Sequence, residues 1–424
     1  MDNVIAILKA RGFIDQMSSP ELEKLAEKPL AVYCGFDPTA SSLHLGNLVA
    51  IMGMAWFQKC GHTPVAVVGG ATGMIGDPGG KSQERNLLDE ETIAENLKGI
   101  RQNLEQVLQQ KTPKLLVINN YDWFKGFSFL HFLRDVGKHF RLGAMLAKDS
   151  VKGRLSSEAG MSFTEFSYQT LQGYDFLYLY EKYGVTLQLG GADQWGNITA
   201  GIDLVRKVKG EEVFGVTFPL LVNADGQKFG KSEKGAIWLS KERLSPYEFY
   251  QYLVRVDDRD VITLLKRLTF LDIREIEKLE KQMGEADYIP NTAQKRLAEE
   301  VTRWVHGEEG LEAALKATAA ARPGHEAALT LEAIEAMGSE LPKKEATLEA
   351  TLGAKMVDLI AGLGVLASKG DVRRLIQNGG LFLNNERVED VGKIIGATDL
   401  IGGRFLLVST GKKNKTVIEI KKSS

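Results

Sequence analysis

The sequence predicts an α/β protein: a doubly wound, mostly parallel, Rossmann-like sheet domain, followed by an α-helical domain and a small α+β domain. Short apolar runs alternate with helix-forming segments through the first half, polar or glycine-rich turns follow several runs, and helical patterns dominate after Trp238. Alternating strands and helices favour a parallel sheet covered on both faces. Because ligands bind at the carboxyl ends of such strands, a site is expected in the turns there.

Apolar runs rich in β-branched residues predict the strands, and longer segments with helical periodicity predict the helices between them. Ahead of the sheet, Ser18, Pro20 and Glu21 have the spacing of a capping box that would begin a short helix at Leu22. The predicted strands are 30–34, 63–68, 114–118, 185–189 and 213–222. The predicted helices are 48–60, 91–110, 164–183 and 192–210.

Length and composition are those of an ordinary globular protein. The 424 residues are enough for two or three domains with their own cores. Lysine and arginine number 53 against 55 aspartate and glutamate, so RNA would have to be bound by local patches. Cys34 and Cys60 cannot build a disulfide framework and favour a reducing compartment. We find neither a signal-peptide pattern nor an apolar run of membrane-spanning length, and expect a cytoplasmic protein without membrane partners.

The stretch 33–47, YCGFDPTASSLHLGN, is the centre of the predicted site. It begins in a strand, passes through a polar turn and ends at a helix start that carries His44 and Asn47. The free N–H groups and the dipole of a helix N-terminus favour a phosphate there. Taken alone, His44 fits a helix cap about as well as a ligand contact.

Two later loops combine glycine with lysine. Residues 69–81 read GGATGMIGDPGGK, and KFGKS at 228–232 follows an Asp-Gly turn that exposes its two lysines. Neither loop is a P-loop, because GDPGGKS and GQKFGKS are each one residue too short between the first glycine and the Gly-Lys-Ser. Dinucleotide, zinc and nucleophile-elbow spacings are also absent from the sequence.

The second half predicts helices and then a small module. Ser245 begins a capping box, and a later helix is expected to end near Gly307. Ser368 caps a helix on which Arg373 and Arg374 point away from the apolar face. Beside it, a lysine cluster between two strands is either a solvated face or an RNA-phosphate surface. These lysines are Lys412, Lys413 and Lys415. The expected boundaries are 1–238 for the sheet domain, 239–321 for the helical domain, 322–353 for a linker and 354–424 for the last domain.

The pairing of HLGN at 44–47 with KFGKS at 228–232 resembles the HIGH and KMSKS motifs of class I aminoacyl-tRNA synthetases. Further strings resemble the bacterial tyrosyl-tRNA synthetase family in order along essentially the whole chain. They are YCGFDPTA, GGATGMIGDP, NNYDWF, FLRDVGKHF, SFTEFSYQTLQGYDF, GGADQWGNI and KFGKS.

The resemblance implies a two-step ligase. Tyrosine and ATP would form tyrosyl-adenylate and pyrophosphate, and the tyrosyl group would then move to the 3′ end of tRNA(Tyr). It implies Mg²⁺ that accompanies ATP, no tightly bound cofactor, no protein metal site, and a homodimer with tRNA spanning the subunits. It also implies that the helical domain helps to recognise the anticodon, and that the last domain is similar to the RNA-binding fold of a ribosomal protein.

The resemblance also assigns roles to residues of this chain, and the chemistry agrees, since a carboxylate suits an ammonium group and Tyr168 and Gln172 share a helical face. Without it, Asp77 and Asp175 would be interpreted as turn or capping residues. The tyrosine-binding residues are Tyr33 and Asp175 at the phenol, Asp77, Tyr168 and Gln172 at the ammonium group, and Gln194 beside them. The ATP and adenylate residues are Cys34, Gly35, Asp37, Asn47, Gly191, Asp193, Lys228 and Lys231. The catalytic, charge-stabilising residues are Thr39, His44, Lys228 and Lys231.

Asn47 departs from the class pattern, because HIGH places histidine there. Asparagine donates a hydrogen bond but carries no charge, so we expect Asn47 to contact the nucleoside or α-phosphate as a neutral donor. Two alternatives stay open. A tryptophanyl enzyme would share both motifs but would need an indole-reading pocket in place of Tyr33 and Asp175. A catalytically silent RNA-binding relative would use only the later domains.

Overall fold

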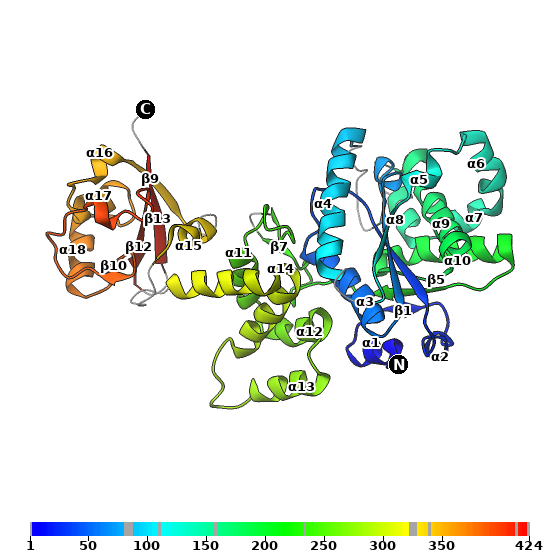
Figure 1. Cartoon of the computed structure of the whole chain (residues 1–424), viewed down its shortest axis with the longest axis horizontal. Helices are drawn as coiled ribbons and strands as arrows, with labels where there is room; N and C mark the ends of the chain where they lie inside the picture. Colours follow the sequence, from blue (N-terminus) through cyan, green and yellow to red (C-terminus); the bar gives the residue numbers. More distant parts are fainter. Residues whose placement is uncertain are drawn as a thin grey trace. The chain divides into compact units, whose positions relative to one another are not determined.

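A computed structural model describes residues 2–79, 88–108, 112–156, 160–232, 235–321, 329–337, 341–411 and 414–421. The chain divides into two units (Figure 1). The first unit contains Met1–Arg243 and Val256–Val301, and the second contains Leu244–Arg255 and Thr302–Ser424.

A six-stranded sheet forms the centre of the first unit, in the order β1-β6-β5-β2-β3-β4. All pairs are parallel except β1 with β6. The predicted α/β class is therefore confirmed. The predicted strand at 213–222 is shorter in the structure, because Pro219 has no N–H group with which to continue the ladder. The strands are β1 (Gln16–Met17), β2 (Ala31–Phe36), β3 (Thr63–Val68), β4 (Leu116–Asn119), β5 (Val185–Gly191) and β6 (Phe214–Phe218).

Helices cover both faces of this sheet. Gly215 of β6 faces Ile198 of α10, whereas Phe218, three residues later, lies against Gly53 of α3. Since side chains alternate along a strand, α3 and α10 lie on opposite faces. The larger helices of this unit are α1 (Val4–Ala10), α3 (Leu48–Lys59), α4 (Glu90–Leu108), α9 (Phe163–Tyr183), α10 (Trp195–Lys209), α12 (Asp258–Leu268) and α13 (Ile273–Gln282). The shorter ones are α2 (Leu22–Leu25), α5 (Tyr121–Phe124), α6 (Phe129–Asp135), α7 (Leu142–Leu146) and α8 (Asp149–Leu155).

The predicted capping box at Ser18 is wrong. Glu21 occupies the N-cap of α2 and makes no side-chain capping bond. Instead, the Ser18 hydroxyl accepts a 2.9 Å hydrogen bond from the N–H group of Gly215, and the Ser18 N–H group donates to the Gly215 carbonyl. Ser18 thus extends the pairing of β1 with β6, and a long-range backbone pairing takes precedence over a local cap.

A five-stranded sheet in the order β11-β10-β12-β13-β9 forms the second unit together with its helices. The stretch 322–353, expected to be a linker, contains β9 as well as α15 and α16, and β9 pairs in parallel with β13. Of the predicted lysine cluster, Lys412 and Lys413 lie outside the described residues. The strands are β9 (Lys343–Thr347), β10 (Leu381–Leu383), β11 (Glu386–Arg387), β12 (Phe405–Thr410) and β13 (Asn414–Lys421). The helices include α11 (Pro246–Val254), α15 (Leu331–Met337), α16 (Leu348–Thr351), α17 (Met356–Gly362) and α18 (Lys369–Gln377).

The helix signals predicted for the second half are confirmed at Ser245, Ser368 and Gly307. Ser245 makes a full capping box with Glu248 at the start of α11. Ser368 accepts from the N–H group of Asp371 at the start of α18. Helix α14 (Thr292–Ala320) is interrupted at Gly307, where φ is 74° and ψ is 178°. Each helix within the described ranges is too short or too polar to cross a lipid bilayer.

Candidate active site

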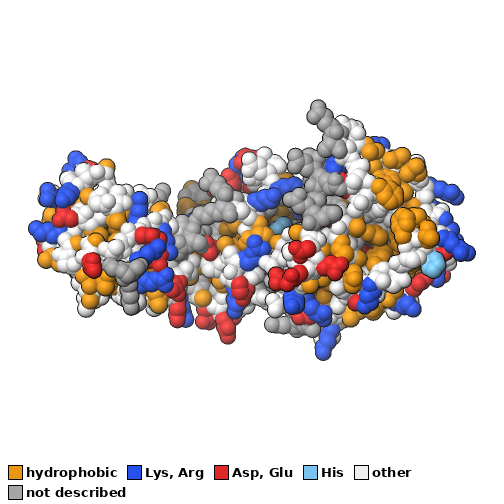
Figure 2. All heavy atoms as spheres, turned by 90° about the horizontal axis from the view of Figure 1, so that it is seen from above, with side chains coloured by type: hydrophobic (Ala, Val, Ile, Leu, Met, Phe, Trp, Pro, Cys, Tyr) orange, Lys and Arg blue, Asp and Glu red, His pale blue; other side chains and the backbone are white. Residues whose placement is uncertain are grey.

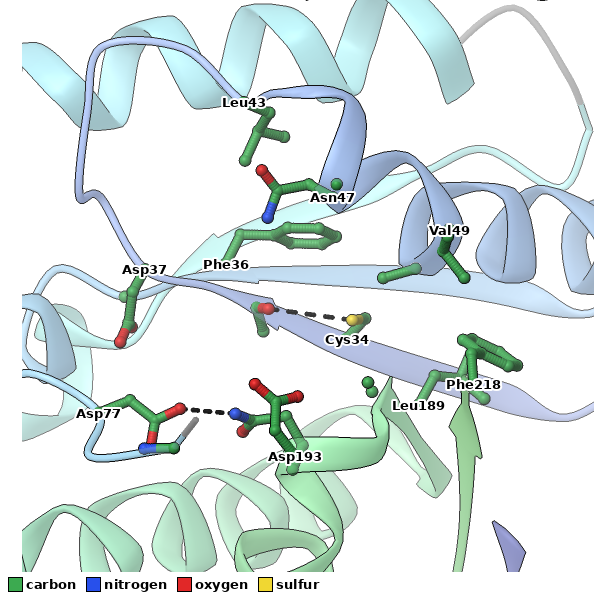
Figure 3. A pocket seen from close by; sticks show the side chains of 18 of the residues that line it. Cys34, Phe36, Asp37, Leu43, Asn47, Val49, Asp77, Leu189, Asp193 and Phe218 are labelled. Carbon is green, nitrogen blue, oxygen red and sulfur yellow. Dashed lines mark hydrogen bonds between the residues drawn. The ribbon is translucent and has the colours of Figure 1, made fainter. Parts of the chain in front are cut away.

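A cavity of about 410 Å³ opens at the carboxyl ends of β2 and β5 in the first unit (Figure 3). This is where a parallel sheet is expected to bind its ligand. Every site residue predicted above lines this cavity. These residues are Tyr33, Cys34, Gly35, Asp37, Thr39, His44, Asn47, Asp77, Tyr168, Gln172, Asp175, Gly191, Asp193, Gln194, Lys228 and Lys231.

One end of the cavity is polar but deeply buried. Asp175 of α9 is 4% exposed, and its two carboxylate oxygens accept hydrogen bonds from Trp123 Nε1 (2.9 Å) and Asn120 Nδ2 (3.2 Å). Burial raises the pKa of Asp175 to about 8, although these two hydrogen bonds act in the opposite direction. The two hydrogen bonds thus hold the buried carboxyl group in one orientation.

Tyr33 of β2 lies at the same end. Its ring is 1% exposed and packs edge-to-face on Phe176, with ring centroids 5.2 Å apart. Its hydroxyl is buried and makes no hydrogen bond within the part of the chain that the structure describes. Burial, followed by the charge of Asp175, raises the pKa of Tyr33. A buried hydroxyl without a partner is costly, so this atom is poised for a polar group of a ligand.

A chain of hydrogen bonds crosses the middle of the cavity. The Tyr168 hydroxyl donates to Asp37 Oδ2 (2.8 Å), and the Thr72 hydroxyl donates to Asp37 Oδ1 (2.7 Å). Burial, and then the charge of Asp37, raise the pKa of Tyr168. Asn120 donates to both the Thr72 hydroxyl and Asp175, and so joins this chain to the buried end. Asp37 and Tyr168, predicted to contact different parts of the ligand, therefore form one network.

A third carboxyl group, that of Asp77, faces the same space. Asp77 accepts from Gln194 Nε2 (2.5 Å), Asn197 Nδ2 (3.3 Å) and the backbone N–H group of Gly79 (3.0 Å) (Figure 3). Nearby, burial raises the pKa of the Cys34 thiol to about 12, and the thiol donates to the Gly35 carbonyl. This wall of the cavity therefore combines a protonated thiol with one oriented carboxyl group.

His44 caps the turn η1 (Leu45–Asn47), as the helix-cap interpretation proposed, and it also lines the cavity. Its Nδ1 accepts from the Gly46 N–H group (3.0 Å). Its own N–H group donates to Asn47 Oδ1 (3.0 Å), which completes a capping box. Burial, and then the charge of Lys231, lower the pKa of His44. The cap interpretation of His44 is therefore confirmed, and the contact with a ligand stays a prediction, since the cap uses only one ring nitrogen.

The KFGKS loop lies directly against this turn. Lys228 and Lys231 are exposed and line the cavity. Gly230 between them has a φ of +87°, and a Cβ atom there would come within 3.0 Å of the Gly46 backbone nitrogen. Glycine is therefore required both by the backbone conformation and by the close approach of the two motifs.

Three polar residues of the site were not found from the sequence. Thr72, Asn120 and Trp123 hold the carboxyl groups of Asp37 and Asp175. These roles depend on contacts with residues far along the chain, so the spacing of residues in the sequence does not predict them. Within the described residues, no cluster of three or more His, Cys, Asp or Glu side chains could hold a metal ion.

The family comparisons cover most of the chain. Residues 25–321 match the tRNA synthetases of class I (W and Y). Residues 333–418 match the tyrosine–tRNA ligase SYY-like C-terminal domain.

Individual proteins of the same family also match the chain. The chain is 59% identical over 422 residues to a tyrosine–tRNA ligase of Protochlamydia amoebophila, a match that covers 99% of each chain. It is 48% identical over 421 residues to the tyrosine–tRNA ligase of Bacillus caldotenax, covering 98% of this chain and 99% of that one. The structure of a C-terminally truncated mitochondrial tyrosyl-tRNA synthetase of Aspergillus nidulans has a TM-score of 0.66 and 31% identity over 74% of this chain and 92% of that one. The chain therefore belongs to the tyrosyl-tRNA synthetase family of class I aminoacyl-tRNA synthetases.

Proposed function

We propose that this chain joins tyrosine to tRNA(Tyr) in two steps, by way of tyrosyl-adenylate. One observation carries the choice of amino acid: the buried hydroxyl of Tyr33, which has no hydrogen-bond partner among the described residues, lies in the same pocket as the carboxyl group of Asp175. A phenol O–H group donates one hydrogen bond and accepts another. It would donate to Asp175 and accept from Tyr33, which satisfies both residues at once.

The same atoms argue against tryptophan as the substrate. An indole N–H group donates one hydrogen bond and accepts none, so it could pair with Asp175 or with the Tyr33 hydroxyl but not with both. The tryptophanyl-tRNA synthetase of Encephalitozoon cuniculi has a TM-score of 0.53 and 13% identity, a likeness that concerns the fold alone. The pocket chemistry rather than the fold therefore favours tyrosine.

The amino group of tyrosine would bind beside Asp77, Tyr168 and Gln172. A carboxylate oriented by Gln194 and Asn197 is a suitable partner for an ammonium group. Because the Tyr168 hydroxyl also donates to Asp37, the amino-acid and adenylate sites would be coupled through Tyr168.

The adenylate would lie along the ends of β2 and β5. Cys34, Gly35, Asp37 and Asn47 would contact it from the β2 side, with Gly191 and Asp193 opposite. Thr39, His44, Lys228 and Lys231 would stabilise the charge that develops as pyrophosphate leaves. Such a reaction needs placed positive charge and donors rather than a covalent nucleophile.

Magnesium would arrive with ATP. The ion binds phosphate oxygens readily and retains water ligands, so it does not require a cage of protein side chains. We therefore assign Mg²⁺ to the substrate and no resident metal to the chain.

Transfer to tRNA would involve the later parts of the chain. Helix α18 exposes Arg373 and Arg374, while Val372 and Ile376 face its core. Exposed arginines on a small α+β fold suit RNA phosphates. The helical region 239–321 would help to place the anticodon.

A second copy of the chain is the proposed partner of an apolar surface on the first unit. Large side chains there are exposed: Leu130 by 74%, Phe163 by 67%, Phe129 by 65% and Leu142 by 62%. They lie on α6, α7 and α9, and Figure 2 shows hydrophobic side chains over this part of the unit. Exposed apolar patches of this kind mark protein interfaces. The two cysteines are free and buried, which suits the cytoplasm as the proposed compartment.

Amino-acid-dependent exchange between ATP and pyrophosphate tests the proposal without tRNA. Tyrosine, phenylalanine and tryptophan would be compared with the full chain. We expect exchange with tyrosine alone. Exchange with tryptophan would contradict the assigned pocket, and folded protein that binds tRNA(Tyr) but supports no exchange would favour the silent RNA-binding relative.

A further inference from the structure

The two motif loops of the active site are joined by a short backbone ladder. The segment after KFGKS runs antiparallel to the segment before HLGN, with Trp238 opposite His44. The Leu45 N–H group donates to the Ile237 carbonyl (2.7 Å), and the Leu239 N–H group donates to the Leu43 carbonyl (2.9 Å). The HLGN turn is therefore part of the same small structure as the chain that leaves the lysine loop.

Side chains continue this connection on one side of the ladder. The rings of Trp238 and His44 meet edge-to-face with centroids 6.2 Å apart. On Trp238, the guanidinium carbon of Arg243 lies 3.6 Å from the ring centroid. Arg243 also donates to the Ser41 hydroxyl (3.3 Å), in the loop that leads to His44. Arg243, Trp238 and His44 thus form a continuous row of contacts that ends at the cavity.

Neither Trp238 nor Arg243 lines the cavity, whereas His44 does. A cation over an indole face is attracted by the ring's electrons and favours one position of the indole. A fixed indole in turn restricts the rotation of the imidazole packed on its edge. We infer that Trp238, supported by Arg243, is a positioning residue that aims the His44 imidazole at the departing pyrophosphate and keeps it in register with the KFGKS loop.

This inference rests on the proposed function, because it assigns a role within adenylate formation. It implies that Trp238 acts through His44 and not through tyrosine binding, since the phenol pocket is formed by other residues. Loss of the indole should therefore lower the rate of the chemical step and leave the affinity for tyrosine unchanged. Misplacement of a catalytic group by about 1 Å lowers the rate roughly a hundredfold, and this is the largest effect expected from loss of the indole.

The test is a double-mutant cycle in the full chain, measured by tyrosine-dependent ATP–pyrophosphate exchange. We expect Trp238→Leu to lower kcat by roughly ten- to a hundredfold, but by no more than His44→Ala does. In the His44→Ala background, Trp238→Leu should have little further effect, because both changes remove the same contribution. Trp238→Phe, which keeps a ring, should retain most of the activity.

Arg243 offers a second test with a matched control. Arg243→Gln should lower kcat about two- to fivefold, as expected for an exposed cation on an aromatic ring, and Arg243→Lys should restore most of it. The matched control is Lys59→Gln. The exposed Lys59 ammonium group lies 4.9 Å from the ring centroid of Trp56, and neither Lys59 nor Trp56 lines the cavity. This control should leave exchange unchanged.

The outcomes are distinguishable. Absence of exchange in the unaltered chain would overturn the proposed function and this inference with it. If the unaltered chain is active but the effects of Trp238→Leu and His44→Ala multiply, Trp238 does not act through His44 and the inference is wrong. Weaker tyrosine binding by Trp238→Leu, measured by equilibrium dialysis, would overturn it equally. Urea unfolding of each variant identifies any loss that reflects misfolding.

Discussion

Trp123 Nε1 donates a hydrogen bond of 2.9 Å to Oδ1 of Asp175, from a position 52 residues earlier in the chain. Asn120, one helical turn away from Trp123, holds the other carboxylate oxygen. The carboxyl group that would recognise the substrate phenol is therefore oriented before any ligand arrives. Such preorganisation reduces the ordering that binding would otherwise require.

Tyr33→Phe should weaken the recognition of the phenol without weakening the fold. We expect kcat/KM for tyrosine to fall roughly 2- to 15-fold, the value of one neutral hydrogen bond, and the preference for tyrosine over phenylalanine to fall with it. The free energy of unfolding should stay equal or rise, because the change removes a buried hydroxyl that has no partner among the residues the structure describes. Exchange kinetics and urea unfolding measure the two effects. Tyr180→Phe, outside the cavity, is the control, and an unchanged preference would contradict the role of Tyr33.

Asp175 should make the ligand-free protein less stable as the pH rises. Its pKa is about 8 in the folded chain and 3.8 ordinarily, so the folded state binds the proton more tightly. Its contribution is fully favourable below about pH 4 and is lost between pH 4 and pH 8, at up to roughly 1.4 kcal/mol per pH unit. We therefore expect the stability difference between the unaltered chain and Asp175→Asn to shrink or reverse across that range. Urea unfolding at several pH values tests this, and a constant difference would contradict it.

Lys228→Ala and Lys231→Ala should each impair the chemical step. Both lysines line the cavity on an exposed loop, where they would meet the phosphates of ATP. Loss of one charged stabilising contact should lower the exchange rate by roughly 10²- to 10³-fold. The affinity for tyrosine in the absence of ATP should be unchanged. Lys278→Ala, on exposed α13 outside the cavity, should behave as the unaltered chain. If all three variants react at the rate of the unaltered chain, neither Lys228 nor Lys231 takes part in the chemical step.

Asn47→Ala should lower the rate of adenylate formation by about tenfold or more, the value of a hydrogen bond to a charged group. Since Asn47 Oδ1 already accepts from the His44 N–H group, its amide nitrogen is the atom left for the ligand. Asn47→Asp keeps the oxygen that completes the turn but loses that donor, so it should be impaired as well. Single-turnover kinetics with tyrosine and ATP measure the step. Unchanged adenylate formation by Asn47→Ala would rule the contact out.

Leu130→Glu should convert the proposed dimer into monomers. A buried charge in an apolar interface is strongly unfavourable, and Leu130 is 74% exposed in the single chain. Sedimentation analysis should show a mass near 46.7 kDa for this variant and about twice that for the unaltered chain. Ile289→Glu is a matched control, because Ile289 is 70% exposed but lies between α13 and α14. A monomeric unaltered chain would contradict the proposed partner.

The five parallel strands of the sheet and the residues that line its cavity could be predicted from the sequence, for different reasons, whereas the short strand β1 was not predicted. Strands such as β3 are continuous apolar runs, whose pattern survives without tertiary information. Residues such as Asp77 and Asp175 were selected only by family resemblance, because their own spacing suggested turns and caps. Strand β9, KKEAT, escaped prediction because a charged edge strand has no apolar run. The role of Trp123 was not predicted, because its partner Asp175 comes close to it only when the chain folds.

The hydrogen bond that caps η1 has a consequence for the proton of His44. An imidazole nitrogen that accepts from the Gly46 N–H group carries no proton, so neutral His44 must carry its proton on Nε2. To become an imidazolium, His44 would have to release Gly46 and open the turn. The fold thereby selects a single tautomer, so that in the proposed reaction His44 would donate a hydrogen bond to the leaving phosphate and would not act as a base.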